Sequence, residues 1–278
     1  MTNIFEEKRR KQEAIDNAMS KIKHVIAVAS GKGGVGKSTV AANIALSLAK
    51  KGYRIGLADA DIYGPSIPTL FNIDNEQVMA AEIDGQQLML PFEKFGIKMM
   101  SVGFFVDKDK PMLWRGPMAA NTLTQMLTET FWDELDFLIL DMPPGTGDIQ
   151  LTLVQQYSVS GAVFVCTPQQ LAVADVRRAV NMFKNDQIPI PIIGLVENMA
   201  YFTPKELPNN KYYIFGKGGG EALAKETGIE LIAQIPISLD ISETNDSGNP
   251  ISLDFSSPEA ECFMQLAEKI AEKTIKQK

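Results

Sequence analysis

The chain has 278 residues, of which 45% are hydrophobic, and a formal net charge of −7. This size and hydrophobic content suffice for one sizeable core, whereas the acidic balance excludes a broad nucleic-acid-binding face, which needs lysine and arginine clusters without matching acids. The two cysteines exclude a disulfide framework. No apolar run reaches the length of a membrane span or forms a signal core, so we expect a cytoplasmic protein with neither a membrane nor a nucleic-acid partner.

The N-terminal residues 1–23 mix many charges with a few apolar side chains, which predicts a helical lead-in. A segment of this composition at a chain end is typical of a solvated arm. From residue 24 onward, short apolar runs rich in β-branched side chains alternate with helical segments. The predicted strands are 24–30, 54–60, 137–142, 161–167, 191–198 and 231–236.

These predicted strands are apolar on both faces, and helices separate several of them. Such a pattern indicates an α/β fold, with a doubly wound, mostly parallel sheet and helices on both faces. Right-handed crossovers place the carboxyl ends of the strands along one edge, where ligands bind. Residues 72–130 are less regular and are predicted as an insertion, with short strands at 87–90 and 97–102 and a helix from about 118 to 131. Pro258 is predicted to begin a closing helix.

The segment GKGGVGKS at 31–38 fits the pattern G-x-x-x-x-G-K-[ST], follows a predicted strand and opens a predicted helix. Glycines allow backbone amides to turn toward phosphate oxygens, and the helix N-terminus adds positive charge. This context predicts a single P-loop ATPase domain over residues 24–278, the alternative for the loop being a tight structural turn. Lys37 is predicted to contact the β- and γ-phosphates of ATP, and Ser38 to bind Mg²⁺. The predicted nucleotide-binding residues of the loop are Gly31, Lys32, Gly33, Gly34, Val35, Gly36, Lys37, Ser38 and Thr39.

Acidic residues follow two of the predicted strands. Asp141 fits the Walker B carboxylate that holds Mg²⁺ in P-loop ATPases, the alternative being a solvated aspartate at a strand end. Asp59 and Asp61 follow another strand, where a carboxylate can orient or deprotonate the attacking water. We assign Asp61 to the water and Asp59 to its support, the alternative being that both cap the following turn. The segment PPGTGD at 143–148 is predicted to respond to the γ-phosphate as a switch loop.

Four motifs of this chain resemble those of a known family. KGGVGKS at 32–38 is similar to the deviant Walker A motif of the MinD, ParA and nitrogenase-iron-protein group, in which an extra lysine, here Lys32, precedes the glycines. The motifs that resemble the Mrp or ApbC branch, the iron–sulfur cluster carrier ATPases, are DADIYGPSIP at 59–68, DMPPGTGD at 141–148, and VENMAYF at 196–202 with IFGKGGGEALA at 214–224. The resemblance covers residues 24 to about 270.

The resemblance implies a homodimer with two nucleotides at the interface, in which Lys32 crosses to contact the phosphates bound by the partner subunit. The resemblance thus implies a catalytic set that consists of Lys32, Lys37, Asp59 and Asp61. Asn198 stands where this group contacts the adenine, and the segment after Pro236 would complete the base pocket. A buried asparagine satisfied by backbone is the alternative for that position.

The family also implies a [4Fe–4S] cluster that bridges two subunits, each of which supplies two thiolates from a CxxC motif after the VENM segment. In this chain that stretch, residues 201–216, contains no cysteine. Cys166 lies in a predicted buried strand and Cys262 on the apolar side of a predicted helix, so we expect both to pack as small hydrophobic side chains. The sequence therefore departs from the family at the cluster-binding motif.

Three functions are compatible with these motifs. The resemblance implies a dimeric ATP-hydrolysing protein of iron–sulfur cluster assembly or transfer, with iron–sulfur apoproteins or assembly factors as partners. An alternative is a MinD- or ParA-like ATPase that organises membrane or DNA cargo, which needs a basic amphipathic helix or a basic face. The terminal segment KIAEKTIKQK has that character only mildly. A third alternative is a scaffold that binds nucleotide without hydrolysing it, and the motifs favour the first function.

Overall fold

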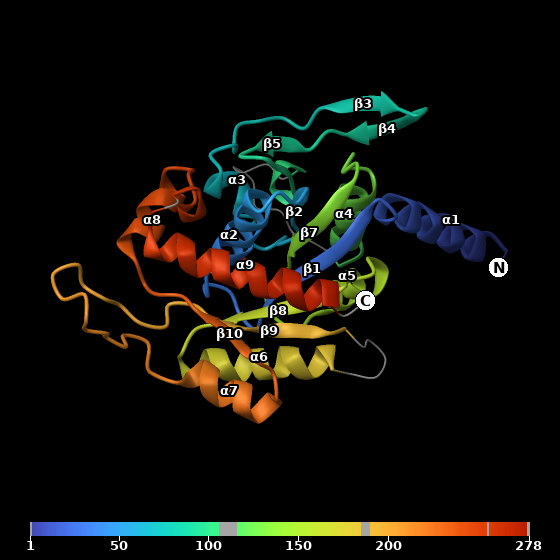
Figure 1. Cartoon of the computed structure of the whole chain (residues 1–278). Helices are drawn as coiled ribbons and strands as arrows, with labels where there is room; N and C mark the ends of the chain where they lie inside the picture. Colours follow the sequence, from blue (N-terminus) through green and yellow to red (C-terminus); the bar gives the residue numbers. More distant parts are fainter. Residues whose placement is uncertain (1, 106–115, 185–189, 255, 277–278) are drawn as a thin grey trace.

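The computed structural model describes residues 2–105, 116–184, 190–254 and 256–276. Within these ranges the chain forms an eight-stranded sheet and a separate two-stranded hairpin (Figure 1). In spatial order the sheet consists of β10 (Leu231–Gln234), β9 (Ile192–Glu197), β8 (Gly161–Cys166), β1 (Ile22–Ser30), β7 (Leu135–Asp141), β2 (Ile55–Asp59), β6 (Ile97–Ser101) and β5 (Phe92–Lys94). Neighbouring strands are parallel except β5 and β6, which are antiparallel.

The remaining elements are α1 (Thr2–Met19), α2 (Lys37–Lys50), α3 (Ile67–Leu70), β3 (Ala80–Ile83), β4 (Gln86–Met89), η1 (Val102–Phe105), α4 (Gly116–Thr128), α5 (Asp148–Gln156), α6 (Gln170–Phe183), α7 (Gly219–Thr227), α8 (Leu239–Asp246), η2 (Ile251–Leu253) and α9 (Pro258–Lys276). Alternate residues of a central strand point to opposite sides of the sheet. Because both sets are apolar here, helices cover both faces of the sheet. Ile26 and Val28 of β1 pack in one core cluster with residues of α2, α3 and α9. Ala27 and Ala29 pack in another with residues of α1, α4, α5, α6 and α7. The predicted doubly wound, mostly parallel α/β fold is therefore confirmed.

Residues 72–130 belong to the sheet more closely than predicted. β6 pairs in parallel with β2, from Ile97 opposite Ile55 to Ser101 opposite Asp59, and β5 extends the sheet beyond it. The prediction of an insertion is therefore wrong for β5 and β6, whereas the β3–β4 hairpin does project from the body (Figure 1). β6 is short and follows the antiparallel strand β5, so the local sequence resembles a surface hairpin. In the folded chain, however, β6 is largely buried.

Helix α1 is packed along its second half. Ile15 and Met19 are 2% and 8% exposed, and both belong to the core cluster that contains Leu123 of α4. The expectation of a solvated arm is therefore wrong for this half of the helix. β1 begins at Ile22, inside the predicted lead-in. None of the described helices is both long and apolar enough to cross a lipid bilayer.

Candidate nucleotide-binding site

The central strands place three polar side chains in one row at the carboxyl edge of the sheet. Asp141 of β7 is the register partner of Val28 in β1 and of Asp59 in β2, and Asp59 is the partner of Ser101 in β6. Register partners on parallel strands point to the same face, which here is the face where Val28 packs with α2. Because Lys37 is the first residue of α2, the order strand, loop, helix brings its side chain to this row.

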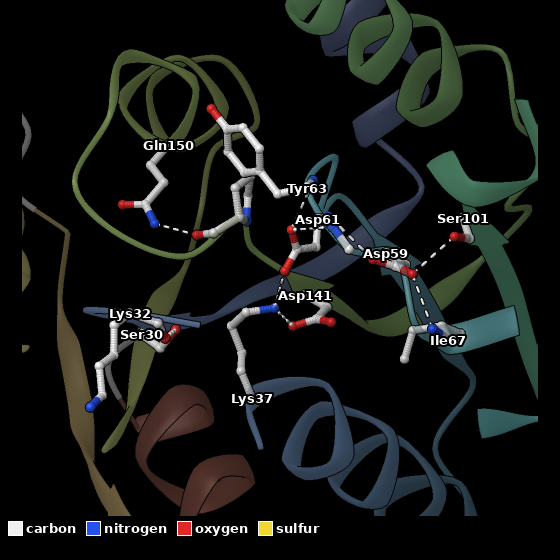
Figure 2. A network of polar contacts seen from close by, with 12 residues as sticks. Ser30, Lys32, Lys37, Asp59, Asp61, Tyr63, Ile67, Ser101, Asp141 and Gln150 are labelled. Atoms are coloured by element: carbon white, nitrogen blue, oxygen red, sulfur yellow. Dashed lines mark hydrogen bonds and ion pairs between the residues drawn. The ribbon is translucent and has the colours of Figure 1, made fainter. Parts of the chain in front are cut away.

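The side chain of Lys37 is buried between two aspartates, as Figure 2 shows. Its Nζ lies 2.6 Å from Asp141 Oδ1 and 3.2 Å from Asp61 Oδ2. Burial lowers the pKa of Lys37, but the charges of Asp141 and Asp61 outweigh this effect, so the pKa lies above its ordinary value. Lys37 therefore stays charged and neutralises part of a buried acidic cluster.

Asp59 is fully buried, and its two oxygens are held by protein groups. Oδ1 accepts a hydrogen bond from the amide of Asp61 at 3.1 Å. Oδ2 accepts from the Ser101 hydroxyl at 2.9 Å and from the amide of Ile67 at 3.1 Å. These contacts match the turn-capping alternative, because they fix the chain that leads from β2 to α3.

Asp61 divides its oxygens between the turn and the site. Oδ1 accepts hydrogen bonds from the amides of Tyr63 and Gly64, at 3.1 and 3.3 Å, whereas Oδ2 faces Lys37. Asp61 also lines the cavity in front of the glycine-rich loop. The turn-capping alternative thus describes one oxygen, whereas the other faces Lys37, and the assignment of Asp61 to the attacking water stays a prediction.

The burial of Asp59 predicts a measurable dependence of stability on pH. Burial, followed by the charge of Asp141, raises the pKa of Asp59 from 3.8 to about 7, against the lowering effects of Lys37 and of the hydrogen bonds that Asp59 accepts. The folded chain therefore holds a proton that the unfolded chain has released between these two values, so the free energy of unfolding falls as the pH rises through this window. From about pH 5 to about pH 8 the loss should be about 3 kcal/mol.

Asp59→Asn removes this titration, so its free energy of unfolding should fall less than that of the wild type over the same interval. Urea denaturation at the two pH values measures both differences. Parallel pH profiles for the two proteins would contradict the assignment.

The glycine-rich loop borders a cavity of about 250 Å³. The residues that line it are Ser30, Lys32, Gly33, Gly34, Gly36, Lys37, Ser38, Thr39, Asp61, Gly64, Ser66 and Leu70. Gly36 has a φ of +80°, and a Cβ there would lie 2.2 Å from Nδ2 of Asn198. A Cβ on Gly31 would lie 2.2 Å from the carbonyl carbon of Asp175 in α6. Gly36 therefore requires glycine for its backbone conformation and its size, and Gly31 requires it for close packing against α6.

The groups beside this cavity fit a nucleotide with Mg²⁺. Asp141 Oδ2 is buried without a hydrogen-bond partner in the described part of the chain. Burial raises the pKa of Asp141, against the lowering effects of Lys37 and of the Ser38 hydroxyl beside it. An unpaired buried oxygen next to a hydroxyl suits Mg²⁺, which takes one or two protein ligands and completes its shell with phosphates and water.

Lys32 lies on the loop but points away from Lys37 (Figure 2). Its side chain is half-buried and forms no ion pair with any residue that the structure describes. The Ser30 hydroxyl donates a hydrogen bond to the Lys32 carbonyl at 2.9 Å, which fixes the backbone at this point. Lys32 also lines the cavity in front of the loop, and its contact with a partner subunit stays a prediction.

Neither of the two residues predicted to contact the adenine lines the phosphate cavity, although Asn198 abuts Gly36 of its loop. Asn198 is buried, and its Nδ2 donates a hydrogen bond to the carbonyl of Val35 at 2.9 Å, as the backbone-satisfied alternative expects. Pro236 lines a second cavity of about 560 Å³, together with Tyr201 and Phe202. This cavity shares no lining residue with that of the glycine-rich loop. The base contact of Asn198 and Pro236 therefore stays a prediction.

The two cysteines do not form a ready thiolate pair. Cys166 is fully buried in β8, and burial with the nearby charge of Glu197 raises the pKa of its thiol to about 12. Cys262 of α9 is half-buried and lines the second cavity, and burial followed by Glu259 and Glu261 raises its thiol pKa as well. Because cluster iron binds thiolate, neither residue fits a resident [4Fe–4S] cluster as it stands.

Two polar residues at the site are not singled out by sequence reasoning. Ser101 ends β6 and bonds Asp59, and the rule that ligands meet the carboxyl ends of strands would identify it once this strand is assigned to the sheet. Gln150 lies in the first turn of α5 with its side chain buried, and the sequence around it carries no signal for such a contact.

Comparison with known proteins identifies the family of this chain. The model of a ParA-type family, described as NUBPL iron-transfer P-loop NTPase, matches residues 21–271. The iron-sulfur cluster carrier protein of Aquifex aeolicus is 48% identical over 254 residues, which cover 90% of this chain and 68% of the relative. The iron-sulfur cluster transfer protein NUBPL of Dictyostelium discoideum is 45% identical over 263 residues, which cover 94% of this chain and 80% of the relative.

Solved structures agree with this relationship. A nucleotide-binding protein of Archaeoglobus fulgidus, in complex with ADP, has a TM-score of 0.75 and 39% identity and covers 89% of this chain and 94% of its own. The cell division ATPase MinD of Pyrococcus furiosus has a TM-score of 0.61 and 19% identity, covers 90% and 99%, and shows a shared fold. The resemblance to the Mrp or ApbC branch is thereby confirmed, and this chain belongs to the iron–sulfur cluster carrier family of ParA-type P-loop NTPases.

Proposed function

We propose that this chain binds ATP with Mg²⁺, hydrolyses it as a homodimer, and acts in the assembly or transfer of iron–sulfur clusters to apoproteins. The observation that carries the proposal is the buried contact of Lys37 with Asp61 and Asp141 beside a glycine-lined cavity. One cluster thus supplies a cation for phosphate, a carboxylate for water and a carboxylate for metal. Relatives named as iron-sulfur cluster carrier and transfer proteins support the cellular role.

The proposed hydrolysis requires Lys37 to exchange its contacts with Asp61 and Asp141 for contacts with the nucleotide. Lys37 lines the cavity, so its ammonium can leave Asp141 for the β- and γ-phosphate oxygens of a bound nucleotide. Ser38 and the released Asp141 would then hold Mg²⁺, which supplies positive charge to the phosphates when bound. Asp61 Oδ2, no longer paired with Lys37, faces the attacking water and can accept its proton. Asp59 keeps Asp61 in place through its amide.

Steady-state release of phosphate from ATP tests this proposal directly. We expect turnover that needs Mg²⁺ and stops when EDTA removes it. Binding of ATP without any turnover would instead support a scaffold that binds nucleotide and does not hydrolyse it.

The homodimer is tested through Lys32, whose ammonium has no ion-pair partner among the residues described. Lys32→Ala should reduce ATP turnover by about 100-fold if this lysine acts on the phosphates held by the partner subunit. A mixture with Lys37→Ala should regain activity, since the Lys37→Ala subunit supplies an intact Lys32 to the intact P-loop of its partner. An equal mixture should reach roughly a quarter of the wild-type rate, because half of the dimers carry one complete site each. Two inactive variants that are folded and dimeric, and that stay inactive when mixed, would exclude action across the interface.

This chain is not expected to hold a resident cluster, because its two cysteines do not fit one. After anaerobic reconstitution and desalting, we expect iron and sulfide well below one [4Fe–4S] per dimer. Cys262→Ser should leave these amounts unchanged. A stable cluster that is lost in Cys262→Ser would show that this cysteine is a ligand and would contradict the expectation.

A further inference from the structure

Gln150 has a buried side chain with one unsatisfied end. The residue is 1% exposed, and its Nε2 donates a hydrogen bond to the carbonyl of Pro143. Its Oε1 is buried and has no hydrogen-bond partner among the described residues. A buried amide normally has both ends paired, because an unpaired acceptor has lost water without a replacement. The arrangement therefore leaves one hydrogen-bonding position open inside the protein.

The open position lies next to the switch loop, residues 143–148. Figure 2 shows the Gln150 side chain and its contact with this loop. A second anchor holds the loop at Gly145, whose amide donates to the carbonyl of Ser30 at 2.9 Å. Ser30 also bonds the carbonyl of Lys32 through its hydroxyl, so the same residue connects the switch loop to the P-loop. The switch loop is therefore held by Gln150 on one side and by the P-loop on the other.

Beyond its two anchored residues, Pro143 and Gly145, the loop is exposed. Thr146, Gly147 and Asp148 all face solvent, and they lead directly into the first turn of α5, where Gln150 stands. A shift of this exposed part toward a γ-phosphate moves its amides relative to the buried side chain. A loop amide that this shift brings within hydrogen-bond distance of Oε1 would then pair with it.

We propose that Gln150 is a positioning residue that makes the switch loop respond to a nucleoside triphosphate in preference to a diphosphate. The inference rests on the proposed ATPase function and names a control of that same site. In the triphosphate state both ends of the Gln150 amide are paired, Nε2 with Pro143 and Oε1 with a loop amide. In the diphosphate state Oε1 remains open, so the two states differ by one buried hydrogen bond.

Gln150→Leu removes both polar ends at a similar side-chain volume and provides the test. The dissociation constants of ADP and of a non-hydrolysable ATP analogue are measured, together with kcat and KM. We expect the preference for the triphosphate and kcat each to fall about 10-fold, with the ADP constant within about 2-fold of wild type. If Gln150 served folding alone, Gln150→Leu would weaken the binding of both nucleotides to the same extent.

Gln156→Leu is the matched control. Gln156 ends the same helix and also has a buried Oε1 without a partner among the described residues, but no hydrogen bond to the switch loop is seen. We expect it to keep both the preference for the triphosphate and the kcat of the wild type. An equal change in both variants would overturn the assignment to Gln150.

Amide hydrogen exchange of the wild type supplies a readout that needs no variant. Residues 143–148 should exchange more slowly with the ATP analogue than with ADP, and equal exchange would overturn the inference. The outcomes also separate this inference from the proposed function. Absence of turnover in the wild type sinks the proposed function, whereas the ratio of the two dissociation constants still tests Gln150.

Discussion

Lys37→Ala should abolish ATP turnover and also weaken the fold. Removing the ammonium takes away the cation predicted to contact the phosphates, so the rate should fall at least about 100-fold. It also leaves Asp61 and Asp141 without the counter-ion that lies 3.2 and 2.6 Å away. An unpaired buried charge costs about 3–5 kcal/mol, and the remaining carboxylates can avoid that cost only by binding protons. The loss of stability should therefore be larger at pH 8 than at pH 5.5, as urea denaturation can measure.

Two further variants separate the two effects of Lys37. Lys37→Arg keeps a positive charge between the aspartates, so it should retain most of the stability while turnover stays low, because a planar guanidinium does not replace an ammonium at this position. Lys51 lies just beyond the other end of α2 and pairs with Glu268 on the surface. Lys51→Ala should therefore change neither the stability nor the ATP turnover. Lys37→Ala with a wild-type rate would refute the assigned phosphate site.

The sheet could be predicted from the sequence where its strands are long and apolar on both faces. β1, β7 and β8 are almost entirely buried, and their short apolar runs bounded by loop residues favour strands over helices. β6 is predicted as a strand, but its place in the sheet is not, because its pairing with β2 joins segments that are distant in the chain and leaves no local signal. The packing of Ile15 and Met19 has the same origin, since nothing within α1 shows that α4 will cover them.

The site divides in the same way. The P-loop could be predicted because a short local pattern carries it, and Asp141 because it ends a clear strand. The contacts of Asp59 could not, since they depend on Ser101 in β6 and on the amide of Ile67, which only the folded chain brings together. Gln150 is a further case, because its contact with Pro143 depends on the path of the switch loop. Residues at strand ends are thus predictable as a group, whereas their individual partners are not.

Asp61→Asn should separate hydrolysis from binding. The asparagine has the same shape and retains an oxygen for the amides of Tyr63 and Gly64, so the turn should be preserved. It loses the negative charge and the basic oxygen at the position that faces Lys37. If this oxygen orients and deprotonates the attacking water, kcat should fall about 100- to 10,000-fold. The dissociation constant of ATP should change by less than about 5-fold, because the loop amides and Lys37 still bind the phosphates.

Single-turnover kinetics with labelled ATP distinguish the chemical step from product release in Asp61→Asn. The single-turnover rate should fall as much as kcat, since the missing group acts during cleavage. Asp74→Asn, which alters an aspartate outside the phosphate cavity that accepts a hydrogen bond from Thr69, is the matched control and should keep the wild-type rate. If Asp61→Asn instead loses ATP binding and keeps its rate at saturation, the carboxylate serves to place Lys37 and the water must be activated by another group. Asp59 is too enclosed to be that group, because both of its oxygens are already held by protein donors.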